Sequence, residues 1–391
     1  MRALRLAILV LLLTPALARA SDVTMVARDV PLGGGSRSLS ATTGRFNMVG
    51  LHWQGSGVPL LRARSLSGRW GPWLAADDDW GRDGSRWRKG AAEWTGPANA
   101  IQYRLRGEFS HLRSYLLWSP PEPQPVRRLA LAGAPPIIPR LSWGADESIR
   151  RAPPVFADAI RFALVHHTVN TNGYTKLQSA AIVHGIEVYH VKGNGWNDIG
   201  YNFLVDRFGQ VFEGRYGGVE KNTVGAHSQG FNTGSVGVAV IVTYASTGIT
   251  QAARGALVKL LAWRLDIAHV DPLSFVNVLS GGNTKYPAGI PVDLRAISGH
   301  RDTYLTDCPG GSLYAQLPSI AHAVAASGGP KLYAPAIAGK LGGAIRFTGR
   351  LSAAQPWTVS ITDATGAVVA SGGGKGTAID WTWSSSLAPA G

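Results

Sequence analysis

The chain has 391 residues, a formal net charge of +14 and a single cysteine, Cys308. This length allows about two or three domains with real hydrophobic cores, and one cysteine excludes an internal disulfide. The excess positive charge favours anionic partners such as nucleic acid, anionic lipid or acidic cell-wall polymers. Because the sequence has no long basic run, helix-turn-helix pattern or zinc-finger spacing, a nucleic-acid partner is not expected.

Residues 1–20, "MRALRLAILVLLLTPALARA", have the pattern of a signal peptide. Arg2 and Arg5 precede a short apolar run, and small residues follow where a signal peptidase could cut. The apolar run is too short for a comfortable membrane span, and no later stretch approaches roughly 20 uncharged apolar residues. We therefore expect a secreted protein of the cell envelope, without a stable membrane anchor.

Residues 21–118 are predicted to form a small, β-sandwich-like accessory domain. Apolar and polar residues alternate along 45–117, as in Ile101, Tyr103 and Leu105, and this period of two is typical of half-buried strands. Tryptophans are frequent here and indicate either a packed core or a carbohydrate-binding face. They are Trp53, Trp70, Trp73, Trp80, Trp87, Trp94 and Trp118.

Two segments of this domain share an Arg-x-Arg element. It occurs as Arg62 and Arg64 in "LLRARSLSGRW" and as Arg104 and Arg106 in "YRLRGEF". We interpret the two elements as a feature of paired strands, and the sequence assigns them no ligand.

Residues 119–139 contain seven prolines and predict a stiff, extended linker. From 140 to 326 the pattern changes to alternating strands and helices, which indicates an α/β domain with a central mixed β-sheet and flanking helices. The expected elements are strands at 162–168 and 236–244, a hairpin at 201–215, and helices at 174–190 and 250–269, the last with Thr250 as N-cap and Leu257, Leu260, Leu261 and Leu265 on one face.

Residues 327–391 begin rich in Gly, Ala and Ser and then contain three strand-like runs. We expect a Gly/Ala-rich linker followed by a C-terminal β domain, with a turn at Ala364–Gly366. The last run ends in "LAPAG" with no strand after it, so we expect this domain to lack its final strand, as in a truncated chain.

Three parts of the α/β domain supply metal-ligand side chains: His166 and His167 at the end of a strand, His300, and Cys308 eight residues later. Two imidazoles and a thiolate suit zinc and leave its fourth position open. Adjacent strand residues face opposite sides, so only one of His166 and His167 can reach the ion. Spacing alone leaves open a buried thiol beside hydrogen-bonded histidines.

Five motifs resemble the family of peptidoglycan recognition proteins and type-2 N-acetylmuramoyl-L-alanine amidases. They are "RLSWGA" (140–145), "LVHHTVN" (164–170), "GWNDIGYNFLVDRFGQVFEGR" (195–215), "VGAHSQGFNTGSVGVAVI" (224–241) and "GHRDTYLTDCPG" (299–310). Their order and spacing match over roughly 140–326. The resemblance implies a zinc site formed by His166, His300 and Cys308, with His167 outside the ligand set.

The same resemblance implies roles for further residues. Tyr201 matches the catalytic tyrosine, whose phenol can donate to the attacking water or to the oxyanion. Thr306 matches a position that orients water or polarises the carbonyl. Four residues are implied to contact the muramyl peptide: Thr168, His227, Asn232 and Arg301.

The expected activity is zinc-dependent hydrolysis of the amide bond between N-acetylmuramic acid and L-alanine in peptidoglycan. Family members that only recognise the wall lack the cysteine, and Cys308 is present here. Two alternatives remain: a non-catalytic peptidoglycan-binding module, and a cysteine hydrolase with Cys308 as nucleophile and His300 as base. We expect a monomer with peptidoglycan as its partner.

Overall fold

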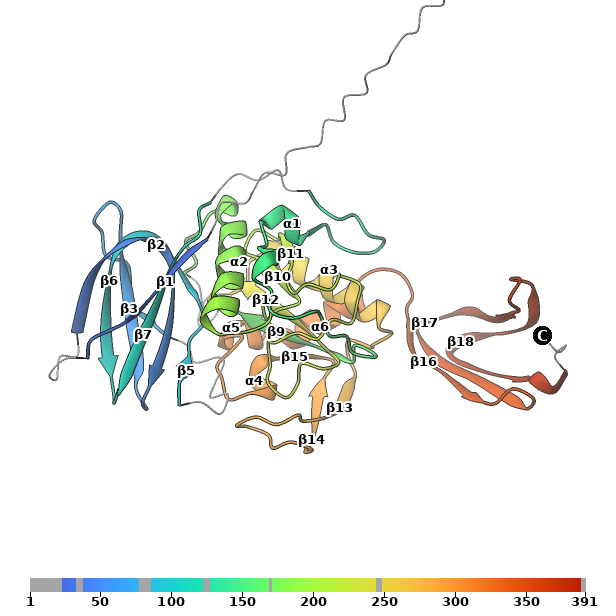
Figure 1. The fold of residues 1–391 in the computed structure, drawn as a ribbon. Coiled ribbons are helices and arrows are strands. Elements are labelled where there is room, and N and C mark those ends of the chain that lie inside the picture. The colour runs from blue at the N-terminus through green and yellow to red at the C-terminus, as the bar shows by residue number, and fades with distance from the viewer. Residues whose placement is uncertain are drawn as a thin grey trace, which may run out of the picture.

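The computed structural model divides the chain into an N-terminal β domain, a central α/β domain and a C-terminal β-sheet (Figure 1). Within the described residues, no helix has the length and apolar character needed to cross a membrane. The predicted signal peptide lies outside the described part of the chain. The structure describes residues 23–32, 38–76, 86–121, 127–168, 171–243 and 248–387.

The N-terminal β domain is one antiparallel sheet of seven strands in the order β1-β7-β2-β6-β3-β4, with β5 paired to β2. Of its tryptophans, Trp53 and Trp94 are fully buried, whereas Trp70 and Trp73 are half-buried. The strands are β1 (Thr24–Asp29), β2 (Ser38–Gln54), β3 (Val58–Ser65), β4 (Leu74–Ala75), β5 (Arg88–Lys89), β6 (Glu93–Arg106) and β7 (His111–Trp118).

The α/β domain contains the predicted mixed sheet, with six strands in the order β15-β9-β12-β10-β11-β8. All neighbours pair in parallel except β10 and β11, which form the predicted hairpin. Every residue of β9 and β12 is buried, as expected for central parallel strands. The strands are β8 (Ile137–Ile138), β9 (Phe162–His167), β10 (Phe203–Asp206), β11 (Val211–Glu213), β12 (Ser235–Ile241) and β15 (Ile297–Gly299).

The helices of this domain follow the predicted pattern with one shift. Thr250 caps α3 as expected, because its side chain accepts a hydrogen bond from the Ala253 N–H at 3.1 Å. The helix expected at 174–190 starts later, after a 3-10 turn in which Leu177 is 72% exposed, and it continues as a π-helix over Tyr189–Gly193. The α-helices are α1 (Arg140–Trp143), α2 (Ser179–Val188), α3 (Gln251–Ile267), α4 (His300–Thr303), α5 (Gly311–Tyr314) and α6 (Leu317–Ala325).

Two features of the central domain were not expected from the sequence. Ile137 and Ile138, inside the predicted linker, form the edge strand β8. A two-stranded antiparallel sheet, β13 (Phe275–Leu279) with β14 (Pro291–Arg295), stands beside α4 (Figure 1).

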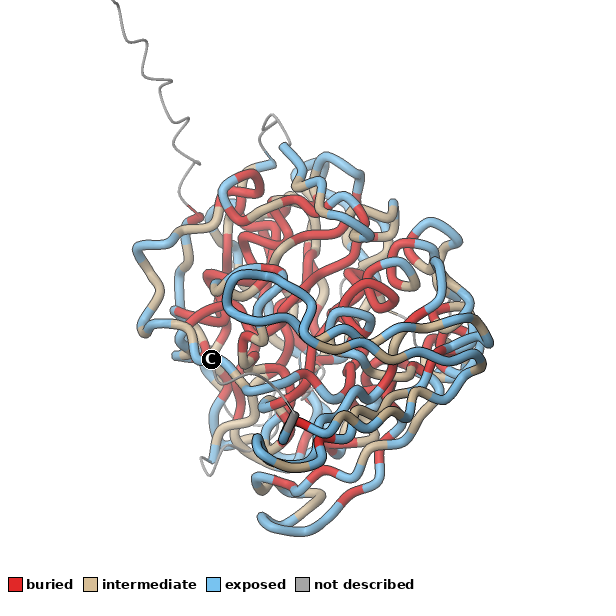
Figure 2. The backbone as a smooth tube through the Cα atoms, turned by 90° about the vertical axis from the view of Figure 1, so that its right-hand side faces the viewer, coloured by how far each residue is buried: buried red, intermediate tan, exposed pale blue. Residues whose placement is uncertain are grey.

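The C-terminal sheet has three antiparallel strands, β16 (Leu332–Gly339), β17 (Ala344–Thr362) and β18 (Val368–Ser384). The turn expected at Ala364–Gly366 joins β17 to β18, and the Asp363 carboxylate accepts the N–H groups of Thr365 and Ala367 there. Buried residues are concentrated in the interior of the central domain, whereas the C-terminal sheet is mostly exposed or half-buried (Figure 2).

The N-terminal β domain packs directly on α2 and the π-helix that follows it. The Tyr189 hydroxyl donates to the Gly90 carbonyl at 2.8 Å, and the Ser119 hydroxyl donates to the Ala181 carbonyl at 2.7 Å. Met48 and Trp94 share one hydrophobic core with the central domain. The two domains are therefore joined by a buried interface.

Candidate metal centre

His166, His300 and Cys308 converge at one end of the central sheet. His166 lies near the end of β9, and β15 pairs in parallel with β9 so that Gly299 lies opposite Val165. This register places His300, the next residue, beside His166. The ligand atoms of the three side chains lie within 4.8 Å of one another, and all three residues are buried. The group could hold a metal ion.

Both imidazoles are held neutral by their surroundings. Burial lowers the pKa of His166 well below its usual value, with further contributions from His300, His227 and His167. Burial also lowers the pKa of His300 to about 3, together with His227, His167 and Lys285. A neutral imidazole has a lone pair free for a metal, so the two histidines fit a ligand role at neutral pH.

The environment of the Cys308 sulfur suits a thiolate. The backbone N–H of His167 donates to Sγ at 3.4 Å, and Sγ lies 3.8 Å from Nδ1 of His166. A donor directed at sulfur stabilises negative charge there. Two imidazoles and one thiolate form a typical three-residue zinc set, so the side chains fit that ion.

His227 lies next to His166, one of the three candidate metal ligands. It is fully buried, and its Nδ1 lies 3.1 Å from Nε2 of His166. Gly237 leaves room for the ring, because a Cβ at that position would come within 2.3 Å of His227 Cδ2. The contact with the muramyl peptide expected for His227 stays a prediction. In this structure the nitrogens of its ring lie within hydrogen-bond distance of His166 and the Ser235 hydroxyl.

Tyr201 is buried beside the metal group, with its ring centroid 5.4 Å from that of His166. The turn before it is fixed by His190, which sequence reasoning missed. The Gly200 N–H donates to Nδ1 of His190 at 3.0 Å, and the His190 ring lies 5.7 Å from that of Tyr201. Burial, with a contribution from Arg215, lowers the pKa of His190 to about 3, so it accepts this bond as a neutral imidazole.

A buried arginine braces the same turn from the other side. The Arg140 guanidinium donates to Glu187 at 2.7 Å and to Asp198 at 3.3 Å. Asp198 also accepts the N–H groups of Ile199 and Tyr216. The motif "RLSWGA" thus has a physical role, because its arginine anchors the segment that carries Tyr201.

The other predicted site residues lie around the group in loops. Thr168 is buried directly after β9, and its N–H donates to Val240. The side-chain oxygen Oδ1 of Asn232 accepts the backbone N–H groups of His227 and Ser228, both at 2.8 Å. Their proposed contacts with substrate remain predictions.

Arg301 and Thr306 support the loop that carries Cys308. The Arg301 guanidinium donates to the Asp307 carbonyl and lies 4.7 Å from the Tyr314 ring centroid. The Thr306 hydroxyl accepts the Cys308 N–H at 3.0 Å. Both side chains therefore have structural contacts in addition to the functional roles predicted for them.

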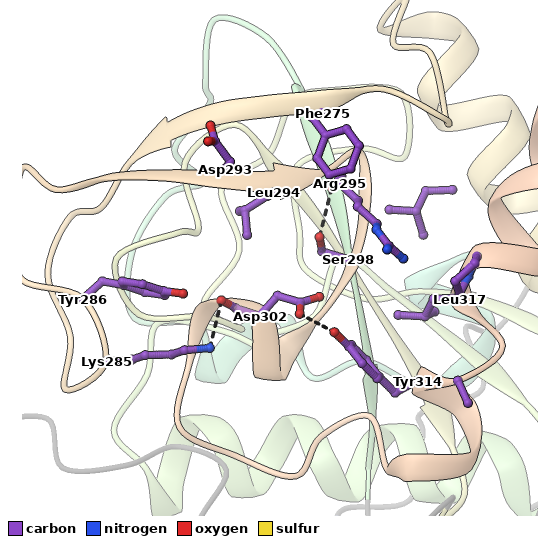
Figure 3. A pocket seen from close by; sticks show the side chains of 13 residues that line it. Phe275, Lys285, Tyr286, Asp293, Leu294, Arg295, Ser298, Asp302, Tyr314 and Leu317 are labelled. Carbon is purple, nitrogen blue, oxygen red and sulfur yellow. Dashed lines mark hydrogen bonds between the residues drawn. The ribbon is translucent and has the colours of Figure 1, made fainter.

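A cavity of about 400 Å³ lies behind the His300 motif, between the β13–β14 sheet and α4 to α6 (Figure 3). Asp302 connects the cavity to the motif, because it accepts the Gly299 N–H at 2.8 Å and the Tyr314 hydroxyl at 2.6 Å. Lys285 donates to the Asp302 carbonyl at 3.1 Å. None of the three candidate ligands lines this cavity, so the cavity is separate from the candidate metal centre.

The geometry agrees with a family comparison. Residues 156–311 match the model of a family described as N-acetylmuramoyl-L-alanine amidase. This stretch is a domain of that family. It includes all three candidate ligands and Tyr201.

Relatives of the amidase domain include recognition proteins and enzymes. Peptidoglycan-recognition protein SC2 of Drosophila melanogaster is 29% identical over 181 residues, which cover 46% of this chain and 84% of that protein. Human N-acetylmuramoyl-L-alanine amidase is 32% identical over 197 residues, covering 49% of this chain and 30% of that protein. Peptidoglycan recognition protein-LE, solved in complex with tracheal cytotoxin, aligns at 27% identity with a TM-score of 0.38, covering 48% of this chain and 94% of that one.

The N-terminal part of the chain has a match of its own. Residues 14–128 match a family described as galactose-binding domain-like. The β domain beside the amidase domain is therefore similar to a domain class distinct from the amidase family.

Proposed function

We propose that the protein is a zinc-dependent N-acetylmuramoyl-L-alanine amidase of peptidoglycan. The observation that carries the proposal is the convergence of His166, His300 and Cys308, buried and within 4.8 Å of one another, beside Tyr201. Three protein ligands would leave one position of a tetrahedral ion for the reaction. The family match and the named amidase relatives support the same activity.

Each side chain near the candidate metal centre has a separate role in the proposed hydrolysis. A zinc ion bound to the three residues would supply a Lewis acid that polarises the scissile carbonyl and lowers the pKa of water. Tyr201 donates its phenolic proton as a hydrogen bond to the oxyanion that forms on the carbonyl. His190 and Asp198 hold the turn that aims Tyr201, and Thr306 orients the water.

Metal content and product analysis test the proposal together. The purified chain is expected to hold about one zinc per molecule, and to release free L-alanine amino termini from muramyl peptides, detected by mass spectrometry. Chelation should abolish turnover and added zinc should restore it. Activity that survives chelation but is lost on thiol alkylation would assign the reaction to Cys308 as nucleophile and refute the zinc mechanism.

Cys308→Ala separates an enzyme from a recognition module. This variant is expected to lose zinc and at least about a hundredfold in turnover, yet still bind insoluble peptidoglycan. Ser312→Ala, at a half-buried position in the same region, serves as the matched control and should keep zinc and activity. Peptidoglycan binding by the native chain without any product would identify a non-catalytic module.

We also propose that the chain acts outside the cytoplasm, at the cell envelope. The pattern of residues 1–20 supports export, and peptidoglycan, the proposed substrate, is found there. N-terminal sequencing of the protein recovered from its source should give a first residue near position 21. A mature protein that begins at Met1 would contradict this proposal.

A further inference from the structure

The two Arg-x-Arg elements of the N-terminal β domain lie on neighbouring strands. In the antiparallel pair of β3 and β6, Arg62 lies opposite Gln102 and Leu60 opposite Arg104. Directly opposed residues point to the same face of a sheet, and so do residues two apart on one strand. Arg62, Arg64 and Arg104 therefore share one face, while Leu61, Ala63 and Tyr103 are buried on the other.

Two tryptophans lie among these arginines. The Arg62 and Arg104 guanidinium carbons lie 4.6 Å and 4.4 Å from the Trp73 ring centroid. Arg62 is also 5.1 Å from the centroid of Trp70, and Arg64 is 5.9 Å from it. We call Arg62, Arg64, Arg104, Trp70 and Trp73 the arginine face.

The guanidinium groups are held in place by neutral groups. Nε of Arg62 donates to the Gln102 side chain at 2.7 Å, and Nε of Arg64 donates to the Asn99 side chain at 3.2 Å. Within the described residues, none of the three arginines of the arginine face forms an ion pair. Arg62 and Arg64 are held by hydrogen bonds and Arg104 lies against the Trp73 ring. With no carboxylate partner among the described residues, their planar donor groups suit an anion.

The neighbouring strand adds small polar groups. Ser38, Ser40 and Thr42 of β2 are exposed and lie opposite Arg104, Gln102 and Ala100 of β6. Hydroxyl and amide side chains suit the hydroxyl groups of sugars, and exposed indole surface suits the apolar faces of sugar rings. A membrane surface would instead require a contiguous apolar patch, which these residues do not form.

The arginine face lies away from the candidate metal centre. The amidase domain packs against β2, β7 and the first residues of β6 through Met48, Leu117 and Trp94. The strand β3 and the remainder of β6 lie on the far side of the N-terminal domain (Figure 1). A polymer bound there would leave the catalytic group accessible.

We propose that the arginine face binds an anionic polysaccharide of the cell wall. Acidic groups along the polymer accept hydrogen bonds from Arg62, Arg64 and Arg104, and its sugar rings lie against Trp70, Trp73 and the hydroxyl row of β2. The face would hold the protein on the wall independently of the bond that the amidase domain cleaves.

Titration calorimetry of the full chain with polygalacturonate, in about 150 mM salt, tests this proposal. The double variant Arg62→Gln/Arg104→Gln is expected to lose at least about tenfold in affinity, because two charge-assisted contacts are removed. Arg127→Gln/Arg128→Gln, at two exposed positions outside the face, removes the same charge and should keep native affinity. An equal loss in both double variants, or in neither, would overturn the proposal.

Two further probes fix the class of ligand. Neutral dextran should not bind, and oligo-dT of equal charge should bind at least about tenfold more weakly than polygalacturonate. Equal or tighter binding of oligo-dT would assign the face to nucleic acid and overturn the choice of a polysaccharide. Zinc content and hydrolysis of a soluble muramyl peptide should be unchanged in Arg62→Gln/Arg104→Gln, so failure of this proposal is distinguishable from failure of the amidase proposal.

Discussion

Nε2 of His166 lies 3.1 Å from Nδ1 of His227, in the interior of the amidase domain. A hydrogen bond to one nitrogen of an imidazole fixes which nitrogen remains for a metal. His227 therefore orients His166 so that Nδ1, the nitrogen nearest to the Cys308 sulfur, is directed at the metal group. This arrangement gives His227 a positioning role that does not require contact with substrate.

Two substitutions of His227 separate this role from simple packing. Asn carries its amide where Nδ1 of the histidine lies, whereas Gln carries it near Nε2. His227→Gln is expected to lower zinc affinity by about 10- to 100-fold, and His227→Asn by much less. Competition with a chromophoric chelator measures both affinities, and urea unfolding checks that the variants fold. Equal zinc affinity in the two variants would refute the proposal that His227 orients His166.

Tyr201→Phe tests the hydroxyl group without disturbing the ring that packs against His166 and His190. Loss of one oxyanion donor is expected to lower kcat by about 10²- to 10³-fold. KM and zinc content should stay close to native, because the phenol is not a ligand. Steady-state kinetics on a muramyl peptide provides the measurement, and a native kcat would exclude Tyr201 from the reaction.

The sequence predicted the metal group better than its surroundings. His166, His300 and Cys308 were identified through motifs whose spacing reflects the parallel pairing of β9 and β15. His190 was missed because its role depends on a bond to Gly200, which belongs to a different segment. Contacts of this kind arise from tertiary packing and leave no local pattern in the sequence.

Helices and strands with a local sequence signal were likewise predicted better than those that depend on tertiary pairing. Helix α3 was predicted with its N-cap, because Thr250 and the buried leucines after it are a local signal. Ile137 and Ile138 were placed in a linker, because two apolar residues among prolines show no period, and only pairing with β11 makes them a strand. The paired Arg-x-Arg elements could be noticed in the sequence, but their common face required the register of β3 and β6.

Gly50 tests the interface between the N-terminal domain and the amidase domain. A Cβ at Gly50 would lie 2.1 Å from Cε2 of Tyr189, whose hydroxyl donates to Gly90. Gly50→Ala is therefore expected to lower the free energy of unfolding by about 1–3 kcal/mol through overpacking. Gly44→Ala, on the same strand with nothing within 4 Å of its Cβ, is the matched control. Equal midpoints of urea unfolding for the two variants would show that Tyr189 moves aside with no loss of stability, which would contradict the prediction.

Acid should destabilise the zinc-free protein through its buried histidines. The pKa of His190 is about 3 in the folded protein, lowered by burial and by Arg215, against 6.5 for an ordinary histidine. The unfolded chain therefore binds a proton that the folded chain excludes. The stability from this group is present above pH 6.5 and is lost as the pH falls from there toward 3, by up to about 1.4 kcal/mol per pH unit.

His190→Asn isolates this contribution, because an amide oxygen can accept the Gly200 N–H in place of Nδ1 but does not titrate. Urea unfolding in the presence of a chelator, at several pH values between about 4 and 8, gives the free energy of unfolding for both proteins. The native protein should lose stability with falling pH more steeply than the variant, by about one proton. Parallel curves would mean that His190 is protonated in the folded protein, and the Gly200 bond would then have to form differently from the way it does in this structure.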